Sequence, residues 1–158
     1  MFWERIDDLE ALRIGIQSEI DAYHYYKDAQ KHFNDREAKE LLAALANEEK
    51  KHRLRLEEEY ARLSGKRLLY INLPKKRRLA KPFLPEASDL EILSVAIEQE
   101  REARDFYEKA AKRTIDPQGR LVFEELIKEE QRHFDLLEAE LHVREKSKSS
   151  GSLKMAKA

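Results

Sequence analysis

Apolar residues recur along the chain at the three- and four-residue intervals of amphipathic helices. Leu9, Leu12, Ile16, Ala22 and Tyr26 show this spacing, and Leu41, Leu42, Leu45 and Leu56 repeat it. No stretch shows the strict alternation of a β-strand. We therefore predict an all-α fold with helices over about 6–33, 35–64, 89–113 and 118–144.

The connections between these helices are short, long and short. Residues 33–35 and 114–119 form the two short breaks, whereas the segment 65–88 contains three prolines and cannot be one long helix. Ser88 and Glu91 have the spacing of a capping box at the start of the third helix. This order predicts a four-helix bundle made of two helical hairpins joined by a crossover. We expect one domain over residues 1–145 and a basic, flexible tail over 146–158.

The composition excludes several classes of protein. Charged residues make up 40% of the 158 residues, and no apolar run approaches the roughly 20 residues that a membrane helix needs. The chain has no cysteine, so it has no disulfide and no thiolate metal site. The first residues, MFWERIDD, lack the basic-then-apolar order of a secretion signal. We expect a cytoplasmic protein that makes no contact with a membrane.

The net charge of −1 conceals a strong segregation of charge. Residues 66–81 carry seven basic side chains and residues 144–158 carry five; the remainder has 19 basic and 31 acidic side chains, a net charge of −12. An acidic body attracts cations. The run KKRR (75–78) raises the question of nucleic acid, but it is short and interrupted by prolines nearby. We expect a solvated crossover and no nucleic-acid partner.

The two halves of the chain repeat each other at a shift of 81 positions. From Leu12 to Glu59, 15 of 48 aligned residues are identical without a gap. Each half contains Glu-x-x-Ala-x-x-x-Tyr on its first helix and Glu-x-x-His on its second. The residues concerned are Glu19, Ala22, Tyr26, Glu49 and His52 in the first half, and Glu100, Ala103, Tyr107, Glu130 and His133 in the second.

Helix geometry brings the repeated acidic residues to one level. Glu19 and Glu49 each lie 15 residues from a turn near Asn34, and Glu100 and Glu130 lie as far from a turn near Ile115. At about 1.5 Å per residue, all four are about 22 Å from their turns. A residue three positions further along a helix shares its face, so each histidine points the same way as its Glu.

Four carboxylates inside an apolar bundle require a counter-charge. Without one they would take up protons or force the helices apart. Two divalent cations supply four positive charges, and carboxylates with one imidazole per metal suit iron or manganese better than structural zinc. The competing interpretation is that these side chains are ordinary exposed charges. The doubled spacing makes that interpretation much the weaker one.

These motifs resemble those of the rubrerythrin-like branch of the ferritin-like superfamily. The resemblance covers about residues 8–142 and depends on SEIDAYHYY (18–26), NEEKKH (47–52), QEREARDFY (99–107) and KEEQRH (128–133). It implies a ferritin-like bundle that holds two iron ions. By this resemblance Glu19 and Glu100 are terminal ligands, Glu49 and Glu130 bridging ligands, His52 and His133 nitrogen ligands, and Tyr26 and Tyr107 hydrogen-bond donors to ligand carboxylates.

The chain departs from this family in two respects. Rubrerythrins proper carry a cysteine-bound rubredoxin module, so a chain without cysteine needs an external electron donor such as a rubredoxin-like protein. They also carry a further carboxylate where this chain has Ala103. That difference puts peroxidase activity in doubt and leaves a ligand set similar to that of ferritins and oxidases.

The resemblance implies a non-haem di-iron redox protein in iron handling and oxidative-stress defence, which oxidises Fe(II) with O2 or H2O2. We also expect a homodimer. One alternative is an iron-handling cargo of an encapsulin-type shell, since Gly151-Ser152-Leu153-Lys154 in the tail (146–158) resembles a docking peptide. Two further alternatives are a metal-free helical interaction module and an oxygenase that acts on an organic substrate.

Overall fold

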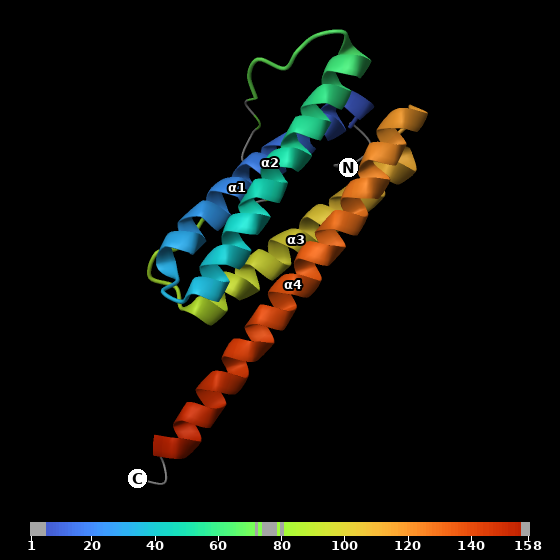
Figure 1. Cartoon of the computed structure of the whole chain (residues 1–158). Coiled ribbons are helices and arrows are strands. Elements are labelled where there is room, and N and C mark those ends of the chain that lie inside the picture. Colours follow the sequence, from blue (N-terminus) through green and yellow to red (C-terminus); the bar gives the residue numbers. More distant parts are fainter. Residues whose placement is uncertain (1–5, 72, 74–78, 80, 156–158) are drawn as a thin grey trace.

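The computed structural model describes residues 6–71, 73, 79 and 81–155, and four helices contain most of them. The helices are α1 (Asp8–His32), α2 (Arg36–Ser64), α3 (Asp89–Arg113) and α4 (Pro117–Met155). Figure 1 shows them side by side as a bundle, with α1 close to α2 and α3 close to α4. The predicted all-α architecture of two hairpins and a crossover is therefore confirmed. The run 75–78 lies outside the described residues.

Side-chain caps fix the beginning of the first three helices. The carboxylates of Asp7 and Asp35 accept hydrogen bonds from the backbone N–H groups of Glu10 and Ala38, at 2.7 and 3.0 Å. The Ser88 hydroxyl accepts from the Glu91 N–H at 3.3 Å, and the Glu91 carboxylate accepts from the Ser88 N–H at 2.7 Å. This reciprocal pair is the predicted capping box.

The fourth helix is longer than its sequence pattern predicts. The prediction that it ends at Arg144 is wrong, because α4 continues to Met155 and extends beyond the other three helices (Figure 1). The segment after Arg144 has no proline and no glycine before Gly151, so each residue can extend the existing helix at little cost. The hydroxyls of Ser147 and Ser149 donate to carbonyls four residues earlier, at 3.0 and 3.1 Å.

Arg144 joins α4 to the ends of two other helices. Its guanidinium donates to Asp35, to Asp89 at 2.8 Å and to Glu140 at 2.7 Å. The same group lies over the ring of Phe33, 4.6 Å from the ring centroid. Asp35 caps α2 and Asp89 begins α3, so a single cation ties three helices together at this end of the bundle.

The apolar core consists of two clusters. One contains Ile14, Ile16, Leu56, Phe106, Phe123 and Leu126, and the other contains Phe33, Leu42, Leu45, Ile92, Leu93 and Leu137. Along each helix, at least one buried charged residue lies between the residues of one cluster and those of the other. Burial of the apolar side chains supplies the main driving force for folding, and it also isolates the charged groups from water. Within the described part of the chain, no helix combines the length and apolar content needed to cross a membrane.

Candidate metal centre

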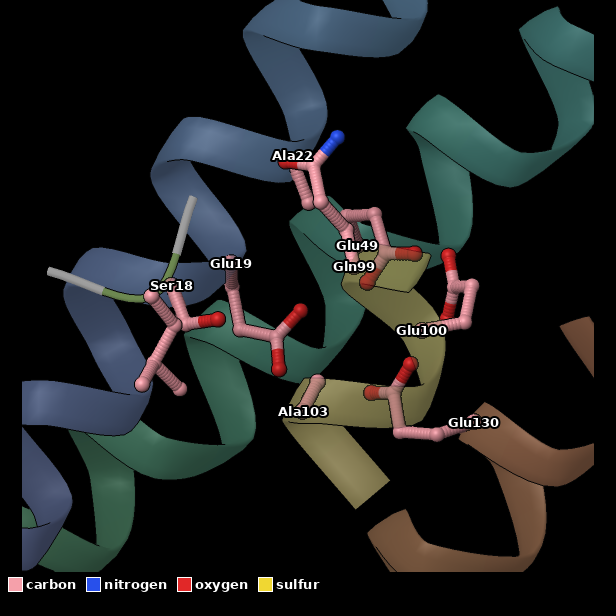
Figure 2. Close-up of a pocket in the computed structure, with 9 residues that line it drawn as sticks. Ser18, Glu19, Ala22, Glu49, Gln99, Glu100, Ala103 and Glu130 are labelled. Carbon is pink, nitrogen blue, oxygen red and sulfur yellow. The ribbon is translucent and has the colours of Figure 1, made fainter. Parts of the chain in front are cut away.

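The six predicted site residues meet in the middle of the bundle. Glu19 comes from α1, Glu49 and His52 from α2, Glu100 from α3, and Glu130 and His133 from α4. All six are at most 3% exposed. Figure 2 shows the four carboxylate groups directed toward one another from the four helices. The equal distances from the turns therefore predicted the relative heights of these side chains correctly.

The two histidines approach the carboxylates through their Nδ1 atoms. His52 Nδ1 lies 3.2 Å from oxygens of both Glu49 and Glu130, and 3.7 Å from Glu19. His133 Nδ1 lies 3.0 Å from Glu49, 3.5 Å from Glu100 and 3.6 Å from Glu130. The six residues thus form two overlapping groups, each with ligand atoms within 4.8 Å of one another, which share Glu49 and Glu130.

Several of these polar atoms have no hydrogen-bond partner among the described residues. They are both carboxylate oxygens of Glu49, one each of Glu100 and Glu130, and the Nδ1 atoms of His52 and His133. Burying one polar group without a partner costs on the order of 1–3 kcal/mol, and more when it is charged. Such a cluster of unsatisfied oxygen and nitrogen atoms fits two divalent cations, which would bind these same atoms.

The protonation of the four carboxyl groups is unequal. Burial raises the pKa of Glu19 and of Glu100 well above its usual value, and the charges of Glu130 and Glu49 raise it further. Burial also opposes ionisation of Glu49 and Glu130. A contact with Glu19 in the case of Glu49, and with Glu100 in the case of Glu130, acts together with contacts to both histidines. These contacts outweigh the effect of burial and hold the pKa of each group below its usual value. The two carboxyl groups that belong to only one of the two groups, those of Glu19 and Glu100, therefore hold a proton more tightly than those of Glu49 and Glu130.

Each half of the repeat orients a carboxylate of the other half. The hydroxyl of Tyr26 on α1 donates to Glu100 on α3, and the hydroxyl of Tyr107 on α3 donates to Glu19 on α1. Both tyrosines are at most 1% exposed. A glycine provides the space for one of them, since a Cβ at Gly15 would lie 3.1 Å from the ring of Tyr107. The predicted position of the tyrosines beside the carboxylates is what the structure shows.

Sequence reasoning missed two acidic residues that contact the histidines. Glu129 Oε2 lies 2.5 Å from His52 Nε2, and Glu48 Oε2 lies 2.9 Å from His133 Nε2. Each contact crosses between α2 and α4. The 81-residue repeat contains a signal that could have found them, because it aligns Glu48 with Glu129 as identical residues.

A small cavity adjoins the carboxylates on the side of α1 and α3. Its volume is about 10 Å³, enough for about one water molecule. Ser18 and Ala22 line it from α1, and Gln99 and Ala103 line it from α3 (Figure 2). The two alanines contribute only methyl groups, so the space beside the carboxylates stays open.

Solved structures of known proteins share this fold. A hypothetical protein from Pyrococcus furiosus is 24% identical with a TM-score of 0.76, and the match covers 87% of this chain and 90% of that one. A bacterioferritin-related protein from Bacteroides fragilis, described as a dodecameric thioferritin, is 20% identical with a TM-score of 0.76, covering 90% and 89%.

A third similar structure is a two-domain protein from Anabaena variabilis with a DJ-1/ThiJ/PfpI-like and a ferritin-like domain. It is 17% identical with a TM-score of 0.73, and the match covers 88% of this chain and 37% of that protein. No curated protein matches the chain. The family model named Rubrerythrin matches residues 10–141, which include all six residues of the centre. The chain therefore belongs to the rubrerythrin family and has the buried carboxylate and histidine set of a di-iron protein.

Proposed function

We propose that the chain is a di-iron oxidoreductase in which bound Fe(II) is oxidised by O2 or H2O2. The observation that supports it best is the pair of overlapping groups of buried, unsatisfied ligand atoms. In this proposal Glu19, Glu49, Glu100, Glu130, His52 and His133 would hold the two irons, with Glu49 and Glu130 belonging to both groups and each histidine offering its Nδ1.

The balance of charge supports two divalent ions rather than one. Four ionised carboxylates carry four negative charges, and with neutral histidines two divalent cations neutralise them. Cation binding would compete with the protons that the raised pKa values of Glu19 and Glu100 favour. Iron is favoured over zinc because carboxylates dominate the ligand set and the chain has no thiolate. Manganese is the alternative metal.

Two bound Fe(II) ions would supply the two electrons that reduce a small oxidant. The protein's own residues hold and isolate the reacting centre. Tyr26 and Tyr107 orient the terminal carboxylates through their hydroxyl groups. The two apolar clusters on either side of the centre exclude bulk water.

The cavity beside the centre favours a small oxidant over an organic substrate. It provides about 10 Å³, whereas pockets for organic ligands are of order 300–1,000 Å³. O2 and H2O2, with two heavy atoms each, are far closer to this size than an organic substrate is. An oxygenase acting on an organic substrate would need a larger opening at Ala22 and Ala103, which line this cavity.

Repeated turnover with peroxide needs an external electron donor, because the chain has no cysteine for a rubredoxin-type centre. A homodimer and docking to a compartment shell through residues 146–158 stay predictions. The mass of the protein in solution tests the first. Co-purification with a shell protein, compared before and after deletion of the tail, tests the second.

The proposed function is tested by loading the metal-free protein with Fe(II) under anaerobic conditions and then adding oxidant. We expect close to two irons per chain and a change in the optical spectrum when O2 or H2O2 is added. Comparison of the rates with the two oxidants separates ferroxidase from peroxide-reducing activity. Loading with Mn(II) in competition tests the choice of metal.

Glu49→Ala and Glu130→Ala should each abolish binding of the metal pair, because each removes a carboxylate shared by both groups. Glu58→Ala is the matched control, since Glu58 is an exposed glutamate on α2. A wild-type protein that binds no iron would refute the proposal. Undiminished binding in the Glu49 and Glu130 variants would do the same.

A further inference from the structure

The face between α2 and α4 carries a reciprocal pair of contacts behind the histidines. Glu129 on α4 contacts His52 on α2 at 2.5 Å, and Glu48 on α2 contacts His133 on α4 at 2.9 Å. The two imidazole rings stack between these contacts, with centroids 5.3 Å apart and planes inclined by 14°. Each hairpin therefore supplies the carboxylate that holds the other hairpin's histidine.

These contacts use the ring nitrogens that face away from the centre. Nε2 of each histidine meets a carboxylate, which in its ionised form only accepts hydrogen bonds. Nε2 must then carry a hydrogen and donate it. In the neutral imidazole Nδ1 is left with its lone pair, and this is the atom directed at Glu49 and Glu130.

Each of the two carboxylates is itself held by an arginine. Arg132 donates to Glu48, and Arg55 lies 3.5 Å from Glu129. Glu48 and Glu129 are 29% and 33% exposed, so they lie between the buried rings and the solvent. The arginines limit the freedom of side chains that would otherwise swing into water, and this makes the contact with each ring more persistent.

We propose that Glu129 and Glu48 are positioning residues that each act on one of the two metal positions. Glu129 would set the orientation and tautomer of His52, and so the metal position formed with Glu19. Glu48 would act in the same way on His133 and the position formed with Glu100. The inference rests on the proposed function only in requiring that two metals bind.

The test is a titration of the metal-free full chain with Co(II), followed by visible absorption and calorimetry. We expect two bound Co(II) in the wild type. Glu129→Ala should weaken one binding event by about 10- to 100-fold and leave the other within about threefold. Glu48→Ala should weaken the other event. Glu129→Gln, which keeps an oxygen that accepts from Nε2, should recover part of the lost affinity.

A double-mutant cycle assigns each effect to one histidine. Glu129→Ala should lower the Co(II) affinity in a His133→Ala background, in which His52 is intact, and have little effect in a His52→Ala background. Glu125→Ala is the matched control. Glu125 also contacts Arg55, at 3.5 Å, but within the described part of the chain it forms no ion pair with His52.

Circular dichroism and thermal unfolding of each metal-free variant show whether the helical bundle is intact. If an alanine variant fails to fold, the Glu48→Gln and Glu129→Gln variants carry the test. If the wild type binds two Co(II) and the variants bind them equally well, the positioning role is refuted and the di-iron proposal stands. Equal weakening of both events by Glu129→Ala would refute the pairwise assignment. A wild type that binds no pair of metals would refute the di-iron proposal itself.

Discussion

Tyr107 on α3 donates its hydroxyl hydrogen to Glu19 on α1, a residue of the opposite hairpin. Tyr26 makes the equivalent bond to Glu100. The repeat therefore does more than place the same residues twice. Its two halves exchange hydrogen bonds across the bundle. The orientations of the Glu19 and Glu100 carboxylates therefore each depend on a tyrosine of the other half.

We predict that Tyr107→Phe weakens metal binding. The change leaves the ring in place and removes the donor to Glu19, and in the metal-bound form, where Glu19 is ionised, a hydrogen bond to a charged group contributes about 1.5–3 kcal/mol. Co(II) titration and urea unfolding with and without metal measure the effect. Tyr25→Phe is the control, because the Tyr25 hydroxyl donates to the carbonyl of Ile92 at 2.8 Å and not to the centre. Tyr25→Phe should lower the stability without changing the metal affinity. If Tyr107→Phe left the metal affinity unchanged, or Tyr25→Phe lowered it equally, this role of Tyr107 would be contradicted.

Gly15→Ala should destabilise the protein, although alanine normally favours a helix by about 1 kcal/mol over glycine. The new methyl group would lie 3.1 Å from the ring of Tyr107 and 3.2 Å from Leu56. Tyr107 cannot easily retreat, because its ring stacks on Phe123 and its hydroxyl binds Glu19. Thermal unfolding and metal titration measure the result. An unchanged metal affinity together with higher stability would contradict this prediction and show that Tyr107 and Leu56 can shift to make room for the methyl group.

The metal-free protein should lose stability as the pH rises above about 6.5. Contacts with carboxylates outweigh burial and raise the pKa of His52 and His133 above the value of 6.5 expected without them. Burial raises the pKa of Glu19 and Glu100. The folded chain then holds protons that the unfolded chain has released, so unfolding becomes easier with increasing pH.

Metal binding should remove this pH dependence, because cations replace the retained protons. Urea unfolding between pH 6 and 9, with and without Co(II), tests the expectation. The increase in stability on adding metal should grow with pH, and proton release should accompany binding. Parallel curves for the two forms would contradict it.

The end of the bundle should depend on Arg144 and much less on the rest of the helix beyond it. Arg144→Ala removes the cation that joins Asp35, Asp89 and Glu140, and we expect a loss of roughly 1–3 kcal/mol. Deletion of residues 147–158 should change the stability by no more than about 0.5 kcal/mol. Chemical unfolding measures the stability of the two variants and of the wild type. If the deletion lowered the stability as much as the substitution does, the prediction would be wrong, and residues 147–158 would make stabilising contacts with the bundle.

Filling the cavity should slow oxidation without removing the metals. Ala103→Leu and Ala22→Leu each place a larger side chain in a space of about 10 Å³. We expect two metals per chain still to bind and the reaction with H2O2 to slow by tenfold or more. In the wild type, tert-butyl hydroperoxide should react far more slowly than H2O2. Equal rates with both peroxides would show that the oxidant reaches the centre by another route.

The sequence was sufficient to predict which carboxylates and histidines meet in the middle of the bundle, because these residues lie on regular helices. Glu19, Glu49, Glu100 and Glu130 are equally far from their turns, and a constant rise per residue converts these counts into one height. Burial at this height follows from the apolar residues that flank it on the same helix faces. No tertiary contact had to be known in advance.

Three features could not be predicted in this way. Glu48 and Glu129 precede Glu49 and Glu130 by one residue, in runs where acidic residues are common. The repeat aligns the two as identical residues, but only the approach of α2 to α4 shows that they contact the histidines. The space beside Gly15 depends on how Tyr107 packs. The length of α4 was underestimated because a polar segment without apolar periodicity gives no signal of where a helix stops.

The crossover between the hairpins has a consequence for assembly. Each ligand group takes residues from both hairpins, since the group of His52 includes Glu130 and the group of His133 includes Glu49. A hairpin alone would have to meet a second one by diffusion, and formation of the centre would then vary with protein concentration. Residues 65–88 join the two hairpins covalently, so their encounter is intramolecular. The complete centre can thus form at any dilution.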